Sequence, residues 1–252
     1  MTADSPVPSD WYQTFFATPV MRFWEAAVPS QATDSEVAFI LRHIGAHPPA
    51  TLLDVPCGAG RHALALASAG FTVAGVDLSQ AALRRAEELA QAAGVHVRLV
   101  HSDMTELDVN TPHDALICMG NSIGYFEPPL TQRLFSRLAG AVRIGGRLIL
   151  DTSICAESVL PIAAQRSFAF PGGTYEQQIT YDAAQSIINT QAQLTLEDQR
   201  HELRYRHFVM TSGELVRSLI AAGFDLRGMY GDTADSAFRP GSPRLLLVAE
   251  RK

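Results

Sequence analysis

The stretch LLDVPCGAGRH, residues 52–62, decides which fold this chain can adopt. It leads from a short β-prone run, 51–55, through Gly58 and Gly60 into a helical segment, 61–69. Glycine has no Cβ, so a ligand can come close to the backbone N–H groups where the helix begins. A strand, a glycine turn and a helix in this order predict the first unit of a nucleotide-binding α/β sheet.

Downstream of this unit, strands and helices alternate. Strands are predicted at 71–76, 95–100, 114–119 and 147–150, and helices at 79–93 and 130–142. Ser79 is the predicted N-cap of the first of these helices, and Gly94 ends it. Strands that alternate with helices of about 10–15 residues indicate a doubly wound α/β fold, with helices on both faces of a mostly parallel sheet.

The end of the chain departs from this alternation. Thr211 and Glu214 form a predicted capping box for a helix that ends at Gly223. The runs 224–230 and 244–250 follow, separated by the turn RPGSP, and are predicted to pair as a β-hairpin.

The first 48 residues are predicted to form a helical N-terminal lid, residues 1–48. Here Thr33 and Glu36 form a predicted capping box for a helix that ends at Gly45. The segment 11–24 gathers both tryptophans and several other aromatic residues. Two interpretations stay open for them: packing against the sheet, or closure over a bound ligand.

A second region outside the alternation is an antiparallel β insert, residues 155–211. Two strands are predicted in it, 187–196 and 203–209, joined by a charged turn around 197–200. We expect this insert to lie on the edge of the sheet or over its ligand-binding end.

The composition excludes several classes of protein. The 252 residues are 47% apolar and 18% charged, which fits one globular domain spanning 1–252 and excludes global disorder. A net charge of −6 and a pI of 5.7 argue against a nucleic-acid partner. Although the mean hydropathy is +0.05, no uninterrupted apolar run reaches the roughly 18 residues of a membrane span.

The start of the chain and its cysteines indicate a cytoplasmic protein. The first residues, MTADSPVPSD, have neither the basic nor the apolar region of a signal peptide. The 3 cysteines are an odd number, which suits a reducing compartment and gives no disulfide framework. The 8 histidines form no cluster with metal-ligand spacing, so no metal site is predicted.

Carboxylates follow the next two predicted strands. Asp77 ends the run 71–76, where it can accept hydrogen bonds from both hydroxyls of a ribose. Asp103 follows the next strand and can accept the adenine amino group, while Met104 and Leu78 can cover the two faces of the ring.

These stretches, LLDVPCGAGRH, VAGVDLS, VHSDM, ALICMGNSIGYF and GGRLILD, resemble the motifs of class I S-adenosylmethionine-dependent methyltransferases. The resemblance covers 51–152 motif by motif, and the final helix and hairpin by pattern. It implies a seven-stranded sheet with an antiparallel last strand and S-adenosylmethionine as cofactor. The implied reaction is in-line methyl transfer to an N or O atom of a small-molecule acceptor.

The resemblance also implies the residues that bind the cofactor: Asp54, Pro56, Gly58, Gly60, Asp77, Leu78, Asp103, Met104, Met119 and Gly120. In this set Asp54 either anchors the glycine loop or reaches the methionine amine. Met119 and Gly120 border the reactive end of the cofactor, where its methyl group lies. Pro56 departs from the small residue usual in the family and removes one N–H donor, but both loop glycines are intact.

Three residues are predicted to act on the acceptor. The segment MGNSIGYF is similar to the GNS segment of glycine and sarcosine N-methyltransferases, which implies that Asn121 orients the acceptor; capping of a turn is the alternative. Tyr125 can hydrogen-bond a nucleophile or serve as packing. His62 is the first candidate for a general base, and a structural role at the start of its helix is the alternative. His101 and His207 are further candidates for the base.

Two other functions stay open at this point. The pattern Gly58-x-Gly60-x-x-Ala63 also satisfies the fingerprint of an NAD-dependent oxidoreductase, although Asp103-Met104 and the terminal hairpin disfavour that reading. The lack of an obvious base leaves room for a non-catalytic S-adenosylmethionine-binding protein.

Overall fold

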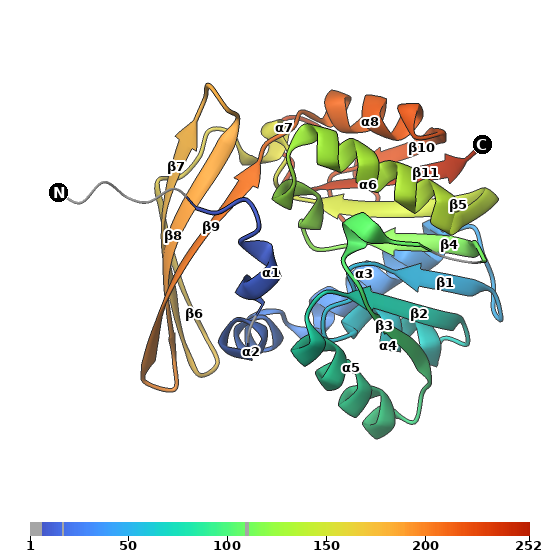
Figure 1. Ribbon diagram of the computed structural model, residues 1–252, viewed down its shortest axis with the longest axis horizontal. Coiled ribbons are helices and arrows are strands. Elements are labelled where there is room, and N and C mark those ends of the chain that lie inside the picture. Colours follow the sequence, from blue (N-terminus) through green and yellow to red (C-terminus); the bar gives the residue numbers. More distant parts are fainter. Residues whose placement is uncertain (1–6, 17, 109–110) are drawn as a thin grey trace.

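The computed structural model describes residues 7–16, 18–108 and 111–252. Its main sheet contains β1 (Thr51–Asp54), β2 (Thr72–Asp77), β3 (Val97–His101), β4 (His113–Cys118), β5 (Val142–Thr152), β10 (Phe224–Tyr230) and β11 (Leu245–Arg251). The strand order is β10-β11-β5-β4-β1-β2-β3 (Figure 1). Strands β5, β4, β1, β2 and β3 are parallel, whereas β11 pairs antiparallel with both β5 and β10. The predicted seven-stranded sheet with an antiparallel last strand is confirmed.

The central strands are buried on both faces because helices cover both sides. On β1 and β4, Leu53 and Leu116 pack in one core, and Leu52 and Ile117 in the other, as the two-residue period of a strand requires. Helices α6 (Pro128–Ala141) and α8 (Ser212–Ala221) complete the first core. Helices α3 (Ser30–His43) and α4 (Arg61–Ser68) complete the second, and α5 (Gln80–Ala93) packs beside α4.

Two predicted helix caps are confirmed and one is wrong. The Ser79 side chain accepts the Ala82 N–H at the start of α5, and Thr211 makes the full capping box with Glu214. Helix α3, however, begins three residues before Thr33, with Pro29 as its N-cap. The capping box predicted for Thr33 therefore does not exist, and both of its residues lie inside the helix.

The insert forms a separate antiparallel sheet of four strands. These are β6 (Gln165–Phe170), β7 (Gly173–Asp182), β8 (Ile187–Leu196) and β9 (Gln199–Phe208), in that order; the short helix α7 (Ala156–Val159) precedes them. The sequence predicted only the last two, and placed the start of the second too late. The β8–β9 turn is tight, with positive φ at Glu197 and Asp198, as a two-residue hairpin loop requires.

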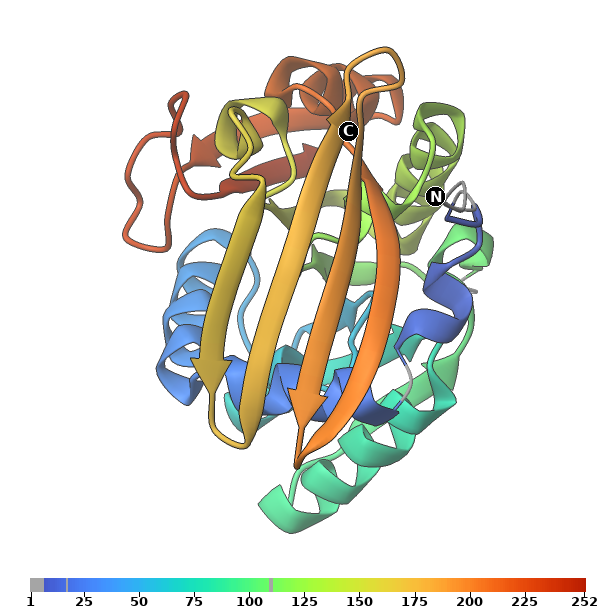
Figure 2. The same ribbon diagram turned by 90° about the vertical axis from the view of Figure 1, so that its left-hand side faces the viewer.

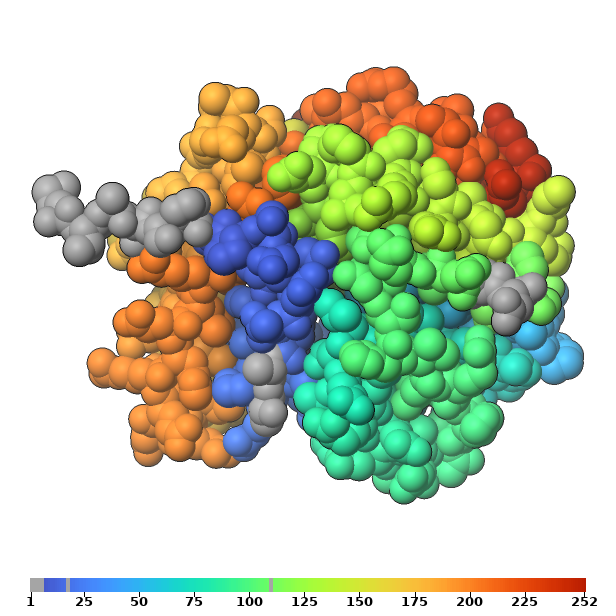
Figure 3. All heavy atoms as spheres, in the orientation of Figure 1, coloured from blue at the N-terminus to red at the C-terminus, as the bar shows by residue number. Residues whose placement is uncertain are grey.

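The N-terminal helices lie between the two sheets (Figures 1 and 2). The part of the predicted lid that precedes α3 forms two helices, α1 (Tyr12–Phe15) and α2 (Thr18–Ala27). Helix α1 contacts β9, and α2 contacts both β8 and α5. In the space-filling view they fill the region between the insert and the main sheet (Figure 3). Among the described residues, no helix is long and apolar enough to cross a membrane.

Candidate active site

The candidate site lies where the carboxyl ends of the central parallel strands meet, as ligand sites do in open α/β sheets. Asp54 ends β1, Asp77 ends β2, and Gly120 follows β4 by two residues. The short 3-10 helices η1 (Met104–Glu106) and η2 (Ser122–Tyr125) follow β3 and β4.

The two loop glycines meet different needs. Gly58 has φ +55°, and a Cβ there would meet nothing within 4 Å, so open space lies over the loop. Gly60 has φ +83°, and a Cβ there would overlap the Leu64 side chain and crowd Ala86. Gly58 therefore leaves room for a ligand, while Gly60 lets α4 pack closely against α5.

Asp54 is a buried carboxylate without a hydrogen bond. It is 1% exposed, and neither of its oxygens has a partner among the described residues. Burial raises the pKa of Asp54 to about 8, although the nearby Arg61 cation opposes this. A buried polar group in a stable protein is normally paired, so this carboxyl group fits a cationic partner such as the amine of S-adenosylmethionine, whose charge would favour its ionised form.

Asp77, rather than Asp54, anchors the glycine loop. Its carboxylate accepts the N–H of Gly58 at 2.7 Å and the N–H of Ser79 at 2.8 Å. Burial raises the pKa of Asp77, and these backbone hydrogen bonds oppose the shift. The carboxylate thus joins the loops after β1 and β2, and its position at the end of β2 is the one that predicted ribose binding.

The residues predicted for adenine lie at the next strand end. Asp103 accepts both the N–H and the hydroxyl of Thr105 at 2.8 Å, and the Tyr12 hydroxyl of α1 is close enough to interact with it. His101 hydrogen-bonds the carbonyl of Leu78 at 2.8 Å, which fixes the turn after β2. Met104 is 7% exposed and packs in the core beneath.

The loop after β4 is tied to the end of β5. The side-chain oxygen of Asn121 accepts a 3.0 Å hydrogen bond from the Ser153 hydroxyl, and the Gly120 N–H donates to Asp151 at 3.1 Å. Asn121 has φ +70° and makes no side-chain cap to η2. Met119, just before, is buried.

A buried ion network supports this loop from behind. Arg244 bonds Asp151 and Glu36, each at 2.8 Å, and Glu36 also pairs with Arg61. The His62 ring lies 2.8 Å from the same Glu36 carboxylate and is 4% exposed. This geometry favours a structural role for His62 over that of a base.

Sequence reasoning missed Glu36, Asp151 and Arg244. A signal existed, because Glu36 shares the buried face of α3 with Phe39 and Ile40, three and four residues further on. A carboxylate on such a face needs a buried cation.

Aromatic side chains from three elements meet in front of the η2 loop. The Trp11 ring, 6% exposed, lies 5.0 Å from Tyr125 of η2 and 5.6 Å from Tyr205 of β9, between ring centroids. His207 of β9 lies 5.6 Å from Tyr125 and contacts Gly124. The insert and the lid segment therefore both reach the place where the sequence predicted the acceptor.

The polar groups of this aromatic cluster are held neutral. Burial lowers the pKa of His207 to about 4 and raises the pKa of Tyr125 above its ordinary value. His207 makes ring contacts but no hydrogen bond within the described part of the chain, and the Trp11 Nε1–H is buried without an acceptor there.

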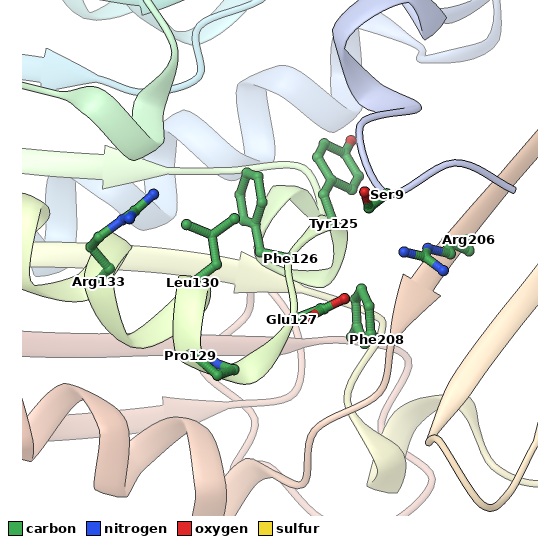
Figure 4. A pocket seen from close by; sticks show the side chains of 9 residues that line it. All are labelled: Ser9, Tyr125, Phe126, Glu127, Pro129, Leu130, Arg133, Arg206 and Phe208. Atoms are coloured by element: carbon green, nitrogen blue, oxygen red, sulfur yellow. The ribbon is translucent and has the colours of Figure 1, made fainter.

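A cavity of about 400 Å³ opens beside this cluster (Figure 4). It lies between the segment before α1, the start of α6 and the end of β9. Its walls are Ser9, Tyr125, Phe126, Glu127, Pro129, Leu130, Arg133, Arg206 and Phe208.

Known proteins with similar sequences and folds are methyltransferases. A family model described as a methyltransferase domain matches residues 52–146. A protein of Geobacillus sp. (strain WCH70) with the provisional name of a methyltransferase is 25% identical over 230 residues, covering 88% of this chain and 93% of its own. The dTDP-3-amino-3,6-dideoxy-alpha-D-glucopyranose N,N-dimethyltransferase of Streptomyces fradiae is 27% identical over 218 residues, covering 82% of this chain and 84% of its own.

Solved structures with a similar fold include methyltransferases as well. An S-adenosylmethionine-dependent methyltransferase from Clostridium acetobutylicum ATCC 824 superposes with a TM-score of 0.79 at 16% identity, covering 91% of this chain and 95% of its own. The seven-stranded sheet, the glycine loop and the carboxyl groups at the strand ends are together the features of the class I S-adenosylmethionine-dependent methyltransferases.

This chain is an S-adenosylmethionine-dependent methyltransferase. The matches favour this function over the NAD-dependent oxidoreductase that the glycine pattern left open.

Proposed function

We propose that the enzyme methylates the neutral nitrogen of a small-molecule amine. The observation that carries this proposal is the burial of His207 and Tyr125 beside the predicted acceptor position, which favours the neutral form of both side chains. A neutral amine attacks the methyl group with its own lone pair, whereas a hydroxyl must lose its proton to a base. Burial holds His207 in its neutral form through most of the pH range, with a pKa of about 4, and it keeps the Tyr125 hydroxyl protonated.

The lowered pKa makes His207 a positioning residue in this proposal. Burial lowers the pKa of His207 to about 4, so its imidazole is a poor acceptor for the proton of an alkylammonium product. The imidazole instead accepts a hydrogen bond from the amine N–H, and the proton leaves to water after methyl transfer. The aromatic walls exclude water during the reaction.

The cofactor supplies a methyl group on a sulfonium, and the strand-end residues hold it. We assign Asp54 to its amine, Asp77 to its ribose, and Asp103 with Leu78 and Met104 to its adenine. Pro56, Gly58 and Gly60 shape the loop around its methionine part, and Met119 and Gly120 border the methyl group. The NH₂ of Asn121 and the ring of Tyr125 face the acceptor.

Further observations support the acceptor class and the setting. The Streptomyces fradiae relative is named for methylation of an amino-sugar nitrogen. The net charge of −6 supports a small molecule over a nucleic acid. Three free, buried cysteines support a cytoplasmic location, and the N-terminal helices are positioned to act as a lid. Cell fractionation and hydrogen exchange with and without cofactor test these two points.

The test of the acceptor class is a transfer assay with methyl-labelled S-adenosylmethionine. Matched acceptors differ only in carrying an amine or a hydroxyl at the same carbon. We expect label on the amines alone, with a rate that rises with pH along the titration of each amine. Labelling of the hydroxyl compounds, or a rate that follows one protein pKa for every acceptor, would contradict the proposal.

A further inference from the structure

The cavity shares Tyr125 with the predicted acceptor position. Tyr125 is in its wall (Figure 4). The same ring contacts Trp11 and His207. Its volume of about 400 Å³ is within the ordinary range of small-molecule sites. An acceptor whose nucleophile lies beside Tyr125 therefore has its remaining atoms in this cavity.

Arg206 of β9 is the unusual residue in the wall. Its guanidinium carbon lies 5.3 Å from the centroid of the Phe208 ring, which restrains the plane of the group. Its Nε is buried and has no hydrogen-bond partner among the described residues. A buried, unpaired donor on a charged group costs free energy that a bound ligand can recover.

The unpaired Nε also specifies the kind of ligand. Arginine holds oxyanions through two parallel N–H···O bonds, and one edge of the guanidinium offers Nε together with a terminal nitrogen. The other charged groups on the cavity wall are Arg133 and Glu127. Arg133 has only a 3.5 Å exposed contact with Glu106, and Glu127 pairs with neither arginine in the described structure. The wall is therefore net positive in a chain of net charge −6.

We propose that this cavity holds the body of the acceptor and that the acceptor carries an oxyanion, carboxylate or phosphate, bound by Arg206. This inference rests on the proposed amine methyl transfer, because it describes the far end of the same acceptor. An amine at one end and an oxyanion at the other define the substrate class as amino acids or phosphorylated amino compounds.

The first test compares acceptor pairs in the labelled-methyl assay. One arm uses amino acids against their amides, and the other uses amino-sugar phosphates against the free amino sugars. We expect the anionic member of one arm to be preferred. In the Arg206→Gln enzyme, the KM for that anionic acceptor should rise about 10- to 100-fold, as loss of a charge-assisted contact predicts. The kcat should change less than about 2-fold. Arg206→Lys should recover only part of the affinity for the anionic acceptor, because the lysine ammonium is a point charge and cannot form two parallel hydrogen bonds.

Arg200→Gln is the matched control, since it removes the same charge from the far end of the same strand. Its KM values should equal those of the wild type. Equal use of anionic and neutral members, or an Arg206→Gln enzyme with unchanged KM for the anionic acceptor, would overturn the inference.

A second test needs no turnover. The NMR signal of the Arg206 Nε–H, assigned by its loss in Arg206→Gln, is followed during titration with acetate, inorganic phosphate and neutral acetamide. We expect it to move with at least one of the anions and not with acetamide; an unmoved signal overturns the inference. Calorimetry with S-adenosylhomocysteine separates the two proposals, because a protein that fails to bind it lacks the proposed reaction whatever Arg206 does.

Discussion

The strand-end edge of the main sheet and the junction of lid and insert treat their polar groups in opposite ways. At the strand ends, Asp77 and Asp103 are held by backbone and hydroxyl donors at 2.7–2.8 Å. At the junction, Trp11 Nε1 and Arg206 Nε are buried without partners among the described residues. Under the proposed assignments, the first region is preorganised for the cofactor, and the second is completed by the acceptor. Asp54 is the exception at the strand ends, and for that reason we propose that it binds the cofactor amine.

The largest effect on cofactor binding is expected for Asp77→Ala. The substitution removes the proposed ribose acceptor and releases the N–H groups of Gly58 and Ser79. Two charge-assisted hydrogen bonds are worth about 3 kcal/mol or more, so the Kd for S-adenosylhomocysteine should rise at least about 100-fold. Calorimetry checks this, with Asp182→Ala in an exposed insert turn as control. A change below about threefold would remove Asp77 from the site.

Glu36→Ala should have the largest effect on stability. It leaves Arg61, His62 and Arg244 around an empty carboxylate position, which costs about 3–5 kcal/mol when a buried charge loses its partner. The network holds the pKa of Glu36 well below its ordinary 4.5, so its contribution is full above pH 4.5 and is lost as the pH falls.

Urea unfolding at neutral and acidic pH measures this contribution. The difference between wild type and Glu36→Ala should shrink on acidification. A difference below about 1 kcal/mol at neutral pH would show that the network does not join α3 to the site.

Asp54→Asn should separate stability from binding. The folded pKa of about 8 exceeds the ordinary 3.8, so the folded protein holds an extra proton between these values and loses stability as the pH rises through them. The asparagine variant should lack this slope and be at least as stable as the wild type near pH 8. Its affinity for S-adenosylhomocysteine should fall about tenfold. Thermal unfolding across this pH range checks the first effect; a wild type without the slope contradicts it.

Trp11→Phe should have the smallest effect, confined to the junction. The phenyl ring keeps most of the packing against Tyr125 and Tyr205 but loses the Nε1–H donor. We expect the acceptor KM to rise about threefold to tenfold, for the loss of one neutral hydrogen bond, with an unchanged Kd for S-adenosylhomocysteine. Trp24→Phe is the control, because that ring is 48% exposed. A weaker cofactor affinity in Trp11→Phe would erase the distinction between the two regions.

Local signals in the sequence predicted the main sheet, because each element carries its own start and stop. The glycine loop, the Ser79 cap and the Thr211 capping box depend on neighbours within a few residues, and the structure contains all three. Strand β7 carried no such signal, since Tyr175 is its one buried residue and its other positions are mixed polar and apolar.

The junction could not be predicted because its residues meet only through tertiary packing. Arg206 and His207 reach Tyr125 because of the β8–β9 register and the docking of the insert, neither of which a single strand encodes. The prediction for Glu36 was wrong for a related reason. Its local sequence matches a four-residue capping box, while its actual partners, His62 and Arg244, are far away in the chain.

The most direct test of the account is a calorimetric comparison of S-adenosylhomocysteine with an analogue that lacks only the amino group. We expect the wild type to bind the complete ligand about tenfold more tightly than the analogue, and Asp54→Asn to bind the two with similar affinity. A wild type that does not distinguish them, or an undiminished preference in Asp54→Asn, would contradict the assignment of the unpaired carboxylate to the cofactor amine.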